Sequence, residues 1–184
     1  MKNIILFLLL ISSLYGDAKV YVGFSGGTYT EVFDDIDASS SASIITSKIG
    51  YGDRKAYGVE FSLDYAKNNS KIFSTSPDMH TDGDRYGFNV SLLKAFDFDI
   101  YALPFVKVGF GTGFLDIDRE LQKNLTYGTF QLTLGTYIPL GDHFDIELGY
   151  EIKHTSYEAI NTIVTQTSYG SKTNSAYLGV NYRY

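Results

Sequence analysis

The residue types most suggestive of catalysis stand close together in the segment KHTSYE, residues 153–158. His154 and Ser156 are two positions apart, so on an extended strand both side chains project from the same face. A histidine that takes the proton of a serine hydroxyl, with an acid that orients the ring, is the machinery of acyl transfer. Glu158 is the acid next to this pair. The pattern makes ester hydrolysis a hypothesis to be tested against the position of the segment.

A carboxylate pair lies just upstream, in FDIELGYEIK, residues 144–153. Glu147 and Glu151 have the residue type that glycosidases use as acid and base or nucleophile. Whether they do so depends on whether a sugar can reach them. The elements that carry these residues therefore decide between the two chemistries.

Those elements are strands, because apolar and polar residues alternate along most of the chain. In AYGVEFSLDYA, Tyr57, Phe61 and Leu63 share one face, whereas Glu60 and Asp64 share the other. We predict eight strands, around residues 20–24, 48–52, 56–66, 85–93, 104–114, 129–138, 144–153 and 175–184.

The connections between these strands alternate in length. Long polar segments lie near 31–45, 67–84, 115–126 and 155–173, and short turns lie near 53–56, 95–100 and 139–143. Short turns at one end and long loops at the other are typical of outer-membrane barrels. In water the apolar face would form a very large exposed patch, which soluble monomers avoid. We therefore predict an all-β fold, an eight-stranded antiparallel up-and-down transmembrane β-barrel.

Composition limits the function classes. The chain has 184 residues, 16 Tyr, 13 Phe, no Cys and a net charge of −6. A negative chain lacks the basic footprint of a nucleic-acid-binding protein, so we expect no such partner. Without Cys there is neither a thiolate metal site nor a Cys nucleophile. We predict no metal site and no cofactor.

The N-terminal segment has the layout of a secretory signal peptide. Lys2 precedes an apolar run from Ile4 to Ile11, and small residues follow, with cleavage expected after Gly16 or Ala18. The run is too short to span a membrane as a helix. We assign residues 1–18 to the signal peptide and 19–184 to the barrel domain, which we place in the bacterial outer membrane.

Strand parity directs a set of charged side chains into the barrel. Eight strands leave a narrow interior, and a buried charge is costly unless it is paired. We predict a polar network that fills the lumen; the alternative is an ion path, because buried ionisable groups in membranes often mark one. In a filled lumen no sugar would reach the carboxylate pair. The predicted network comprises Glu60, Asp64, Lys107, Glu147, Glu151, Lys153 and Arg183, and Lys48 is a further candidate.

The long loops are the remaining candidates for a binding surface. The first is acidic, with Glu31, Asp34, Asp35 and Asp37, and is either a solvated loop or a site for divalent cations near lipopolysaccharide. The second contains Met79 and His80. Apolar residues in the fourth, Ile160, Ile163 and Val164, indicate either a β-extension above the membrane or an adhesive surface.

The last strand carries a recognisable signal. In AYLGVNYRY the apolar residues alternate up to a terminal aromatic, at Leu178, Val180, Tyr182 and Tyr184. This pattern resembles the C-terminal signal that the barrel-assembly machinery reads in outer-membrane proteins, although Phe is the usual last residue. With the signal peptide and eight strands, the chain resembles the small outer-membrane barrels that include OmpX and the OmpA transmembrane domain.

His154 and Ser156 also resemble the His-x-Ser motif of lipid A deacylases of the PagL type, which are eight-stranded barrels with a lipid-facing site. That resemblance implies a general base at His154 and a nucleophile at Ser156. The chain departs from the motif: Tyr157 follows the serine where that family has Asn, and residues 162–171 contain no carboxylate.

Taken together, the sequence predicts a non-enzymatic outer-membrane barrel with a plugged polar lumen and a role in envelope integrity or in adhesion through its loops. The alternatives are a lipid A deacylase-like hydrolase and a small channel. The expected partners are outer-membrane lipids and lipopolysaccharide, the barrel-assembly machinery during insertion, and an unidentified surface ligand.

Overall fold

The computed structural model describes residues 18–34, 38–68, 71–75, 81–119, 122–161, 166–167 and 169–184. The predicted signal peptide up to residue 17, the loop residues Asp35, Asp37, Met79 and His80, and the apolar Ile163 and Val164 lie outside these ranges. Within them, the chain has no helix of the length and apolar character needed to cross a membrane.

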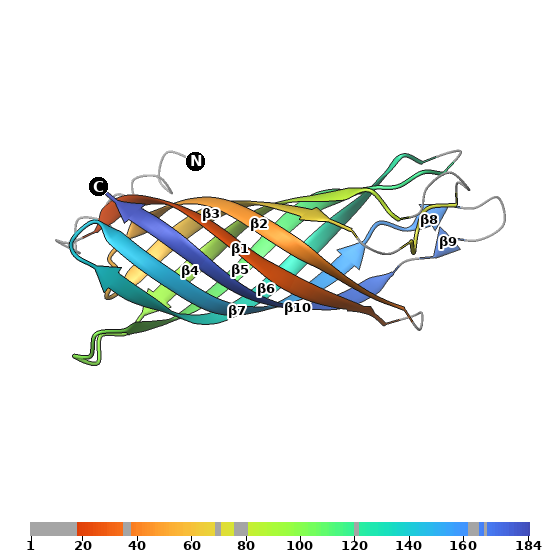
Figure 1. Cartoon of the computed structure of the whole chain (residues 1–184). Helices are drawn as coiled ribbons and strands as arrows, with labels where there is room; N and C mark the ends of the chain where they lie inside the picture. Colours follow the sequence, from red (N-terminus) through yellow and green to blue (C-terminus); the bar gives the residue numbers. More distant parts are fainter. Residues whose placement is uncertain are drawn as a thin grey trace, which may run out of the picture.

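Eight antiparallel strands close into a barrel (Figure 1), which confirms the predicted fold class. Around the barrel the order is β1-β10-β7-β6-β5-β4-β3-β2, and β2 pairs again with β1. The short β8 (Ile160–Asn161) and β9 (Gln166–Thr167) pair only with each other. The barrel strands are β1 (Lys19–Phe33), β2 (Ser39–Gly52), β3 (Tyr57–Lys67), β4 (Asp84–Ala95), β5 (Leu103–Asp116), β6 (Asn124–Leu140), β7 (Phe144–Tyr157) and β10 (Gly170–Arg183).

Pairing of β1 with β10 closes the barrel. The register runs from Tyr21 opposite Arg183 to Phe33 opposite Ser171, and the backbone N–H of Tyr184 donates to the carbonyl of Val20 at 3.0 Å. In lipid an unpaired strand edge would leave backbone groups without partners. Closure explains why the last strand stays ordered up to its terminal aromatic residue.

The alternation of apolar and polar residues gives the barrel an apolar outer face and a polar inner face. Outward side chains such as Leu63, Leu92 and Phe110 are largely exposed and apolar, whereas inward ones such as Glu147 and Asn181 are fully buried and polar. This arrangement is the reverse of a soluble globule and matches a barrel whose exterior meets hydrocarbon.

The strands are longer than the sequence alone indicated. The first connection covers residues 34–38 rather than 31–45, because polar alternation continues past the apolar band on β1 and β2. Assigning Glu31 to the first loop was therefore wrong, since it is an inward residue of β1 that is 2% exposed. In the fourth connection, residues 158–169, the pairing of β8 with β9 provides the β-extension that its apolar residues suggested.

The two ends of the barrel differ (Figure 1), but the predicted alternation of connection lengths holds only in part, because the first connection, 34–38, is shorter than the turn 96–102. We call the end with the connections 34–38, 68–83, 117–123 and 158–169 the loop end. The opposite end, which we call the turn end, has the connections 53–56, 96–102 and 141–143. The C-terminus lies at the turn end.

Candidate functional site

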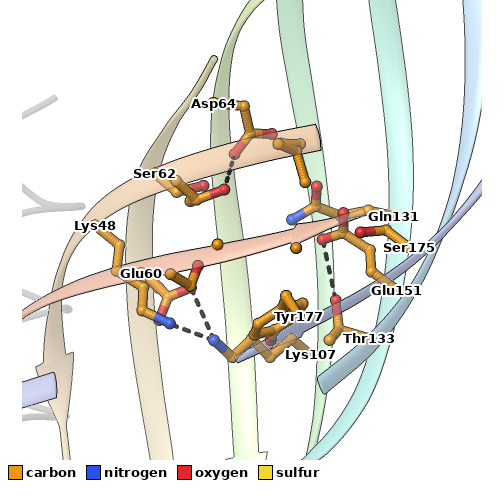
Figure 2. A pocket seen from close by; sticks show the side chains of 15 residues that line it. Lys48, Glu60, Ser62, Asp64, Lys107, Gln131, Thr133, Glu151, Ser175 and Tyr177 are labelled. Carbon is orange, nitrogen blue, oxygen red and sulfur yellow. Dashed lines mark hydrogen bonds and ion pairs between the residues drawn. The ribbon is translucent and has the colours of Figure 1, made fainter. Parts of the chain in front are cut away.

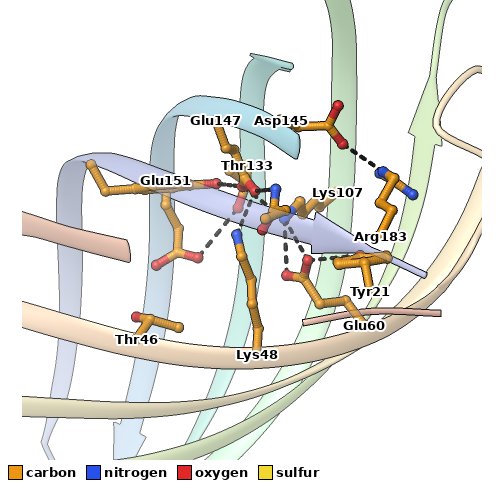
Figure 3. A network of polar contacts seen from close by, with 12 residues as sticks. Tyr21, Thr46, Lys48, Glu60, Lys107, Thr133, Asp145, Glu147, Glu151 and Arg183 are labelled. Atoms are coloured by element: carbon orange, nitrogen blue, oxygen red, sulfur yellow. Dashed lines mark hydrogen bonds and ion pairs between the residues drawn. The ribbon is translucent and has the colours of Figure 1, made fainter. Parts of the chain in front are cut away.

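The centre of the barrel is filled by a cluster of charged groups from four strands (Figure 3). The Lys107 ammonium lies 2.9 Å from both carboxylate oxygens of Glu60 and 2.9 Å from Glu147 Oε1. Lys48 pairs with the other oxygen of Glu147. Since all four groups are buried, each carboxylate compensates an ammonium that could not otherwise leave water.

Neutral donors complete this cluster. Glu147 also accepts hydrogen bonds from the Tyr177 hydroxyl at 2.7 Å and from Asn181 Nδ2 at 2.8 Å. Glu60 accepts one from the Tyr21 hydroxyl at 2.9 Å. Both oxygens of each carboxylate therefore accept hydrogen bonds from protein groups, and the arrangement compensates the buried charges.

A second cluster lies closer to the loop end. Lys153 bridges Asp64 at 2.6 Å and Glu151 at 3.0 Å. Asp64 also accepts hydrogen bonds from Thr46 and Asn89. Glu151 is thus engaged by Lys153 and Thr133, and the carboxylate pair suggested by the sequence belongs to two different clusters.

Small cavities remain between the charged clusters of the described strands. A cavity of about 30 Å³ lies between the two clusters and is lined by residues of both, including Lys107 and Asp64 (Figure 2). A second cavity of about 20 Å³ lies beside Arg85 and Lys153. Each has room for roughly one or two water molecules.

Near the loop end, Arg85 and Glu31 form a third charged layer that the sequence analysis missed. Arg85 Nη1 lies 2.9 Å from Glu31 Oε2, and the guanidinium stands over the Tyr127 ring at 4.5 Å. Glu31 also accepts hydrogen bonds from Tyr157 and Ser171. Arg85 shares its parity with Gly87 and Asn89, so the alternation of β4 already contained the signal for it.

Asp145, which the predicted network did not include, links the barrel wall to the turn end. It is fully buried and binds Arg183 Nε at 2.5 Å and Arg54 Nη1 at 3.1 Å. Arg54 in turn donates to the carbonyls of Gly141 and Asp142. Asp145 has the parity of Glu147, whereas the turn residue Arg54 has no strand parity that would direct it inward.

Apolar clusters close the barrel above and below these layers. Toward the turn end the cluster comprises Leu93, Ala95, Leu103, Phe105 and Tyr137. At the loop end it comprises Phe33, Phe73, Leu115, Ile117, Leu125, Tyr127 and Tyr157. Phe73 comes from the connection between β3 and β4, so a loop residue completes the closure.

The loop that carries Phe73 is held by one buried carboxylate. Asp82 accepts hydrogen bonds from the backbone N–H groups of Ile72, Phe73 and Ser74, at 2.8, 3.0 and 2.7 Å. Arg119 Nε donates to the carbonyl of Phe73 at 2.6 Å. Consecutive N–H groups that converge on one carboxylate form a nest, which fixes the backbone around the aromatic side chain.

The structure places His154 and Ser156 on the outward face of β7, where both are exposed. In the ranges that the structure describes, no hydrogen bond joins His154 to Ser156 or to a carboxylate. The backbone N–H of Glu158 donates to the Thr126 carbonyl, and this ties the acid to β6. The neighbouring strands β6 and β10 carry no carboxylate. Those of β7 itself, such as Glu147 and Glu151, point into the barrel, on the other side of the wall.

This placement gives a prediction for the hydrolase alternative. Lipid A extracted from a Gram-negative host that expresses the wild-type protein should have the same mass spectrum as lipid A from cells that express Ser156→Ala, and as lipid A from the empty-vector strain. The reason is that, among the residues with described positions, no acid is hydrogen-bonded to His154 to orient it toward Ser156. Loss of an acyl chain in the wild type alone would contradict the prediction and make Ser156 a nucleophile.

The fold defines a class of protein: a closed eight-stranded barrel with an apolar exterior and a polar interior, as in small bacterial outer-membrane proteins. Solved structures agree. Neisserial surface protein A superposes with a TM-score of 0.62 and 14% identity over 91% of this chain and 99% of that one. Ail of Yersinia pestis gives 0.58 and 16%, over 91% and 99%. OprG of Pseudomonas aeruginosa gives 0.51 and 10%, over 91% and 97%.

These likenesses confirm the predicted resemblance to the OmpX and OmpA-like barrels at the level of fold. No protein-family model matches the chain. No curated protein matches it either.

Proposed function

We propose that this protein is a non-enzymatic barrel of a bacterial outer membrane that contributes to envelope integrity and offers its loop end for surface interaction. The observation that carries the proposal is the filled interior. Charged layers and apolar clusters occupy the axis, so the chain is built as a stable wall rather than as a path. The apolar exterior supports a location in lipid, and the predicted signal peptide supports export.

The filled interior gives an electrical prediction, which also tests the channel alternative. Purified protein inserted in planar bilayers should leave the baseline current steady across many insertions, because the gaps between the clusters hold only one or two waters. Insertion is checked by the different gel mobility of unboiled and boiled protein recovered from vesicles prepared in the same way. Discrete conductance steps that scale with the amount of folded protein would overturn the closed-lumen proposal.

The surface role rests on the loop end. The paired β8 and β9 extend the fourth connection beyond the barrel wall (Figure 1). Among the similar structures, Ail is described as an attachment invasion locus protein and was solved with a heparin analogue, sucrose octasulfate. We take from it only the use of a small barrel as a platform for attachment.

Replacing residues 160–167 with a short Gly-Ser linker should therefore reduce attachment of expressing cells to cultured host cells. It should leave the heat-modifiable gel band unchanged, since the described residues of this range, 160–161 and 166–167, pair only with each other. A matched replacement in the short turn 141–143 serves as the control. Equal attachment by the wild type and the loop variant would remove this hairpin from the proposed surface.

A further inference from the structure

The turn between β4 and β5 departs from the plain polar turns of the same end. Its sequence FDFDIYA, residues 96–102, alternates aromatic or apolar residues with Asp. Phe98 is 63% exposed and Tyr101 is 70% exposed. In Figure 1 this green segment extends past the barrel wall at the turn end. Large apolar side chains at the tip of a projecting turn need an environment that accepts them.

The turn is held in a defined shape. Lys55 pairs with Asp97 at 2.7 Å, and the other oxygen of that carboxylate accepts the N–H of Asp99 at 3.0 Å. The hydrogen bond from the Lys55 ammonium, and after it the one from the Asp99 N–H, hold the pKa of Asp97 below its ordinary value. The carboxylate therefore keeps its charge to lower pH than a free Asp does. The Tyr101 hydroxyl donates to the Pro139 carbonyl at 2.7 Å. The exposed rings are therefore presented by a built structure.

The two sides of the turn differ in polarity. On one side an open cavity of about 570 Å³ is lined by charged groups of all three turns, including Asp97, Asp99 and Arg54. Phe96 and Phe98 do not line it; their rings stack on each other, with centroids 6.0 Å apart. The backbone N–H of Phe96 still donates to the Pro104 carbonyl, so the pairing of β4 with β5 reaches this residue and Phe96 keeps the outward direction of Leu92. The ring pair therefore continues the apolar face of the barrel.

Lys94 and Tyr57 stand at the base of this ring pair. The Lys94 ammonium lies 4.1 Å from the centre of the Tyr57 ring and 5.7 Å from that of Phe96. A lysine that projects from an apolar face beside aromatic rings is typical of the membrane interface, where the ammonium reaches the phosphates and the rings sit at headgroup level.

We propose that Phe96 and Phe98, with Lys94 and Tyr57 beside them, form an interfacial anchor. The ring pair inserts among the phospholipid headgroups of the leaflet on the turn side, and Lys94 binds a lipid phosphate. The proposal rests on the membrane location proposed above and goes further by naming the ligand and the residues that bind it. The anchor fixes the depth and tilt of the barrel at the end where the loops cannot do so.

Lipid fits this surface better than a protein partner does. The rings are continuous with the lipid-facing side of β4, while the charges of the turn face the cavity on the other side. Two rings also fall far short of the roughly 1,000 Å² that a specific protein interface buries. A second copy of the chain or another protein would have to compete with the bilayer for a surface that the bilayer already adjoins.

The chain has no Trp, so a single introduced Trp reports on one position. We would compare Phe98→Trp with two references in phosphatidylcholine–phosphatidylglycerol vesicles. Leu92→Trp marks the lipid-facing wall, and Asp142→Trp marks a turn in water. Folding of each variant is checked by the gel mobility of the unboiled protein. Emission is recorded with and without lipids that carry bromine near the headgroups or deep in the acyl chains.

Phe98→Trp should emit at shorter wavelength than Asp142→Trp and lose most intensity to the shallow bromines, whereas Leu92→Trp should lose most to the deep ones. If Phe98→Trp matches Asp142→Trp while Leu92→Trp is quenched, the anchor is refuted and the membrane location stands. If Leu92→Trp is not quenched either, the membrane location fails. Phe98→Trp that is shielded from water but not quenched would point to protein cover and would also refute the anchor.

Discussion

Glu147→Gln should lower the free energy of unfolding of the barrel by about 3–5 kcal/mol, the typical cost of removing one partner of a buried ion pair. The change keeps the shape of the side chain but removes its charge. Lys48 then loses its carboxylate, and Lys107 keeps only Glu60. The amide NH₂ replaces one of the two carboxylate oxygens, so it would face a donor, either Tyr177 on the Oε1 side or Asn181 on the Oε2 side. Urea titrations in lipid vesicles, followed by circular dichroism and gel mobility, measure the loss.

Glu158→Gln is the matched control, because it removes the same charge from an exposed side chain and should change stability by less than about 0.5 kcal/mol. A double variant, Lys48→Met with Glu147→Gln, separates ion pairing from packing. It should be less destabilised than the sum of the single variants, since Lys107 and Glu60 still form a neutral pair. Strict additivity, or a loss of unfolding free energy below 1 kcal/mol for Glu147→Gln alone, would show that water stabilises the charges that remain in the lumen.

The contents of the lumen followed from parity alone for most residues. Alternation along β3 and β7 was enough to direct Glu60, Asp64, Glu147 and Lys153 inward, and the narrow interior of eight strands required them to be paired. Parity does not identify the residue with which each inward charged side chain forms an ion pair. Lys48 meets Glu147 across the barrel, 99 positions away in the chain, because the tilt and stagger of the strands set which levels face each other.

The misses have two physical causes. Glu31 was assigned to a loop because its strand has no large apolar outward residue between Phe24 and Val32, where Thr28 and Thr30 continue the alternation with polar side chains. Arg54 lies in a turn, where no period applies, and only the folded turn end brings it to Asp145. By contrast, parity gave His154 and Ser156 a shared face of their strand and directed Glu151 to the other face, which is where the structure has them.

The charged layers and the closure at the loop end are held in place by different parts of the fold. The charged layers are fixed by strands on opposite walls, so opening them requires the barrel itself to distort. Phe73 belongs to a connection and is held by hydrogen bonds to one carboxylate and one guanidinium. Local opening of this segment, residues 71–75, should therefore cost less free energy than opening the charged layers. Its stability can be measured separately from that of the barrel.

Asp82→Ala should release this segment while the barrel stays folded. Asp82 is 1% exposed, and its carboxylate accepts hydrogen bonds from three consecutive N–H groups. Phe73, which is 2% exposed, packs into the apolar cluster at the loop end. Hydrogen bonds to charged groups contribute about 1.5–3 kcal/mol each, but the freed amides regain water when the segment opens, so we expect a net local cost of about 2–4 kcal/mol. That corresponds to hydrogen exchange about 30- to 1,000-fold faster at Ile72, Phe73 and Ser74.

Amide exchange measured by NMR in micelles tests this directly, with the strand amides of the same sample as an internal reference. Asp84→Ala is the control, because it removes a neighbouring carboxylate that binds only the Tyr65 hydroxyl among the described groups. It should leave exchange at residues 72–74 unchanged. If Asp82→Ala also leaves it unchanged, the nest does not hold the segment and the packing of Phe73 alone is sufficient. If strand amides accelerate equally, the segment and the barrel open as one unit, and the loop is part of the wall rather than a separate closure.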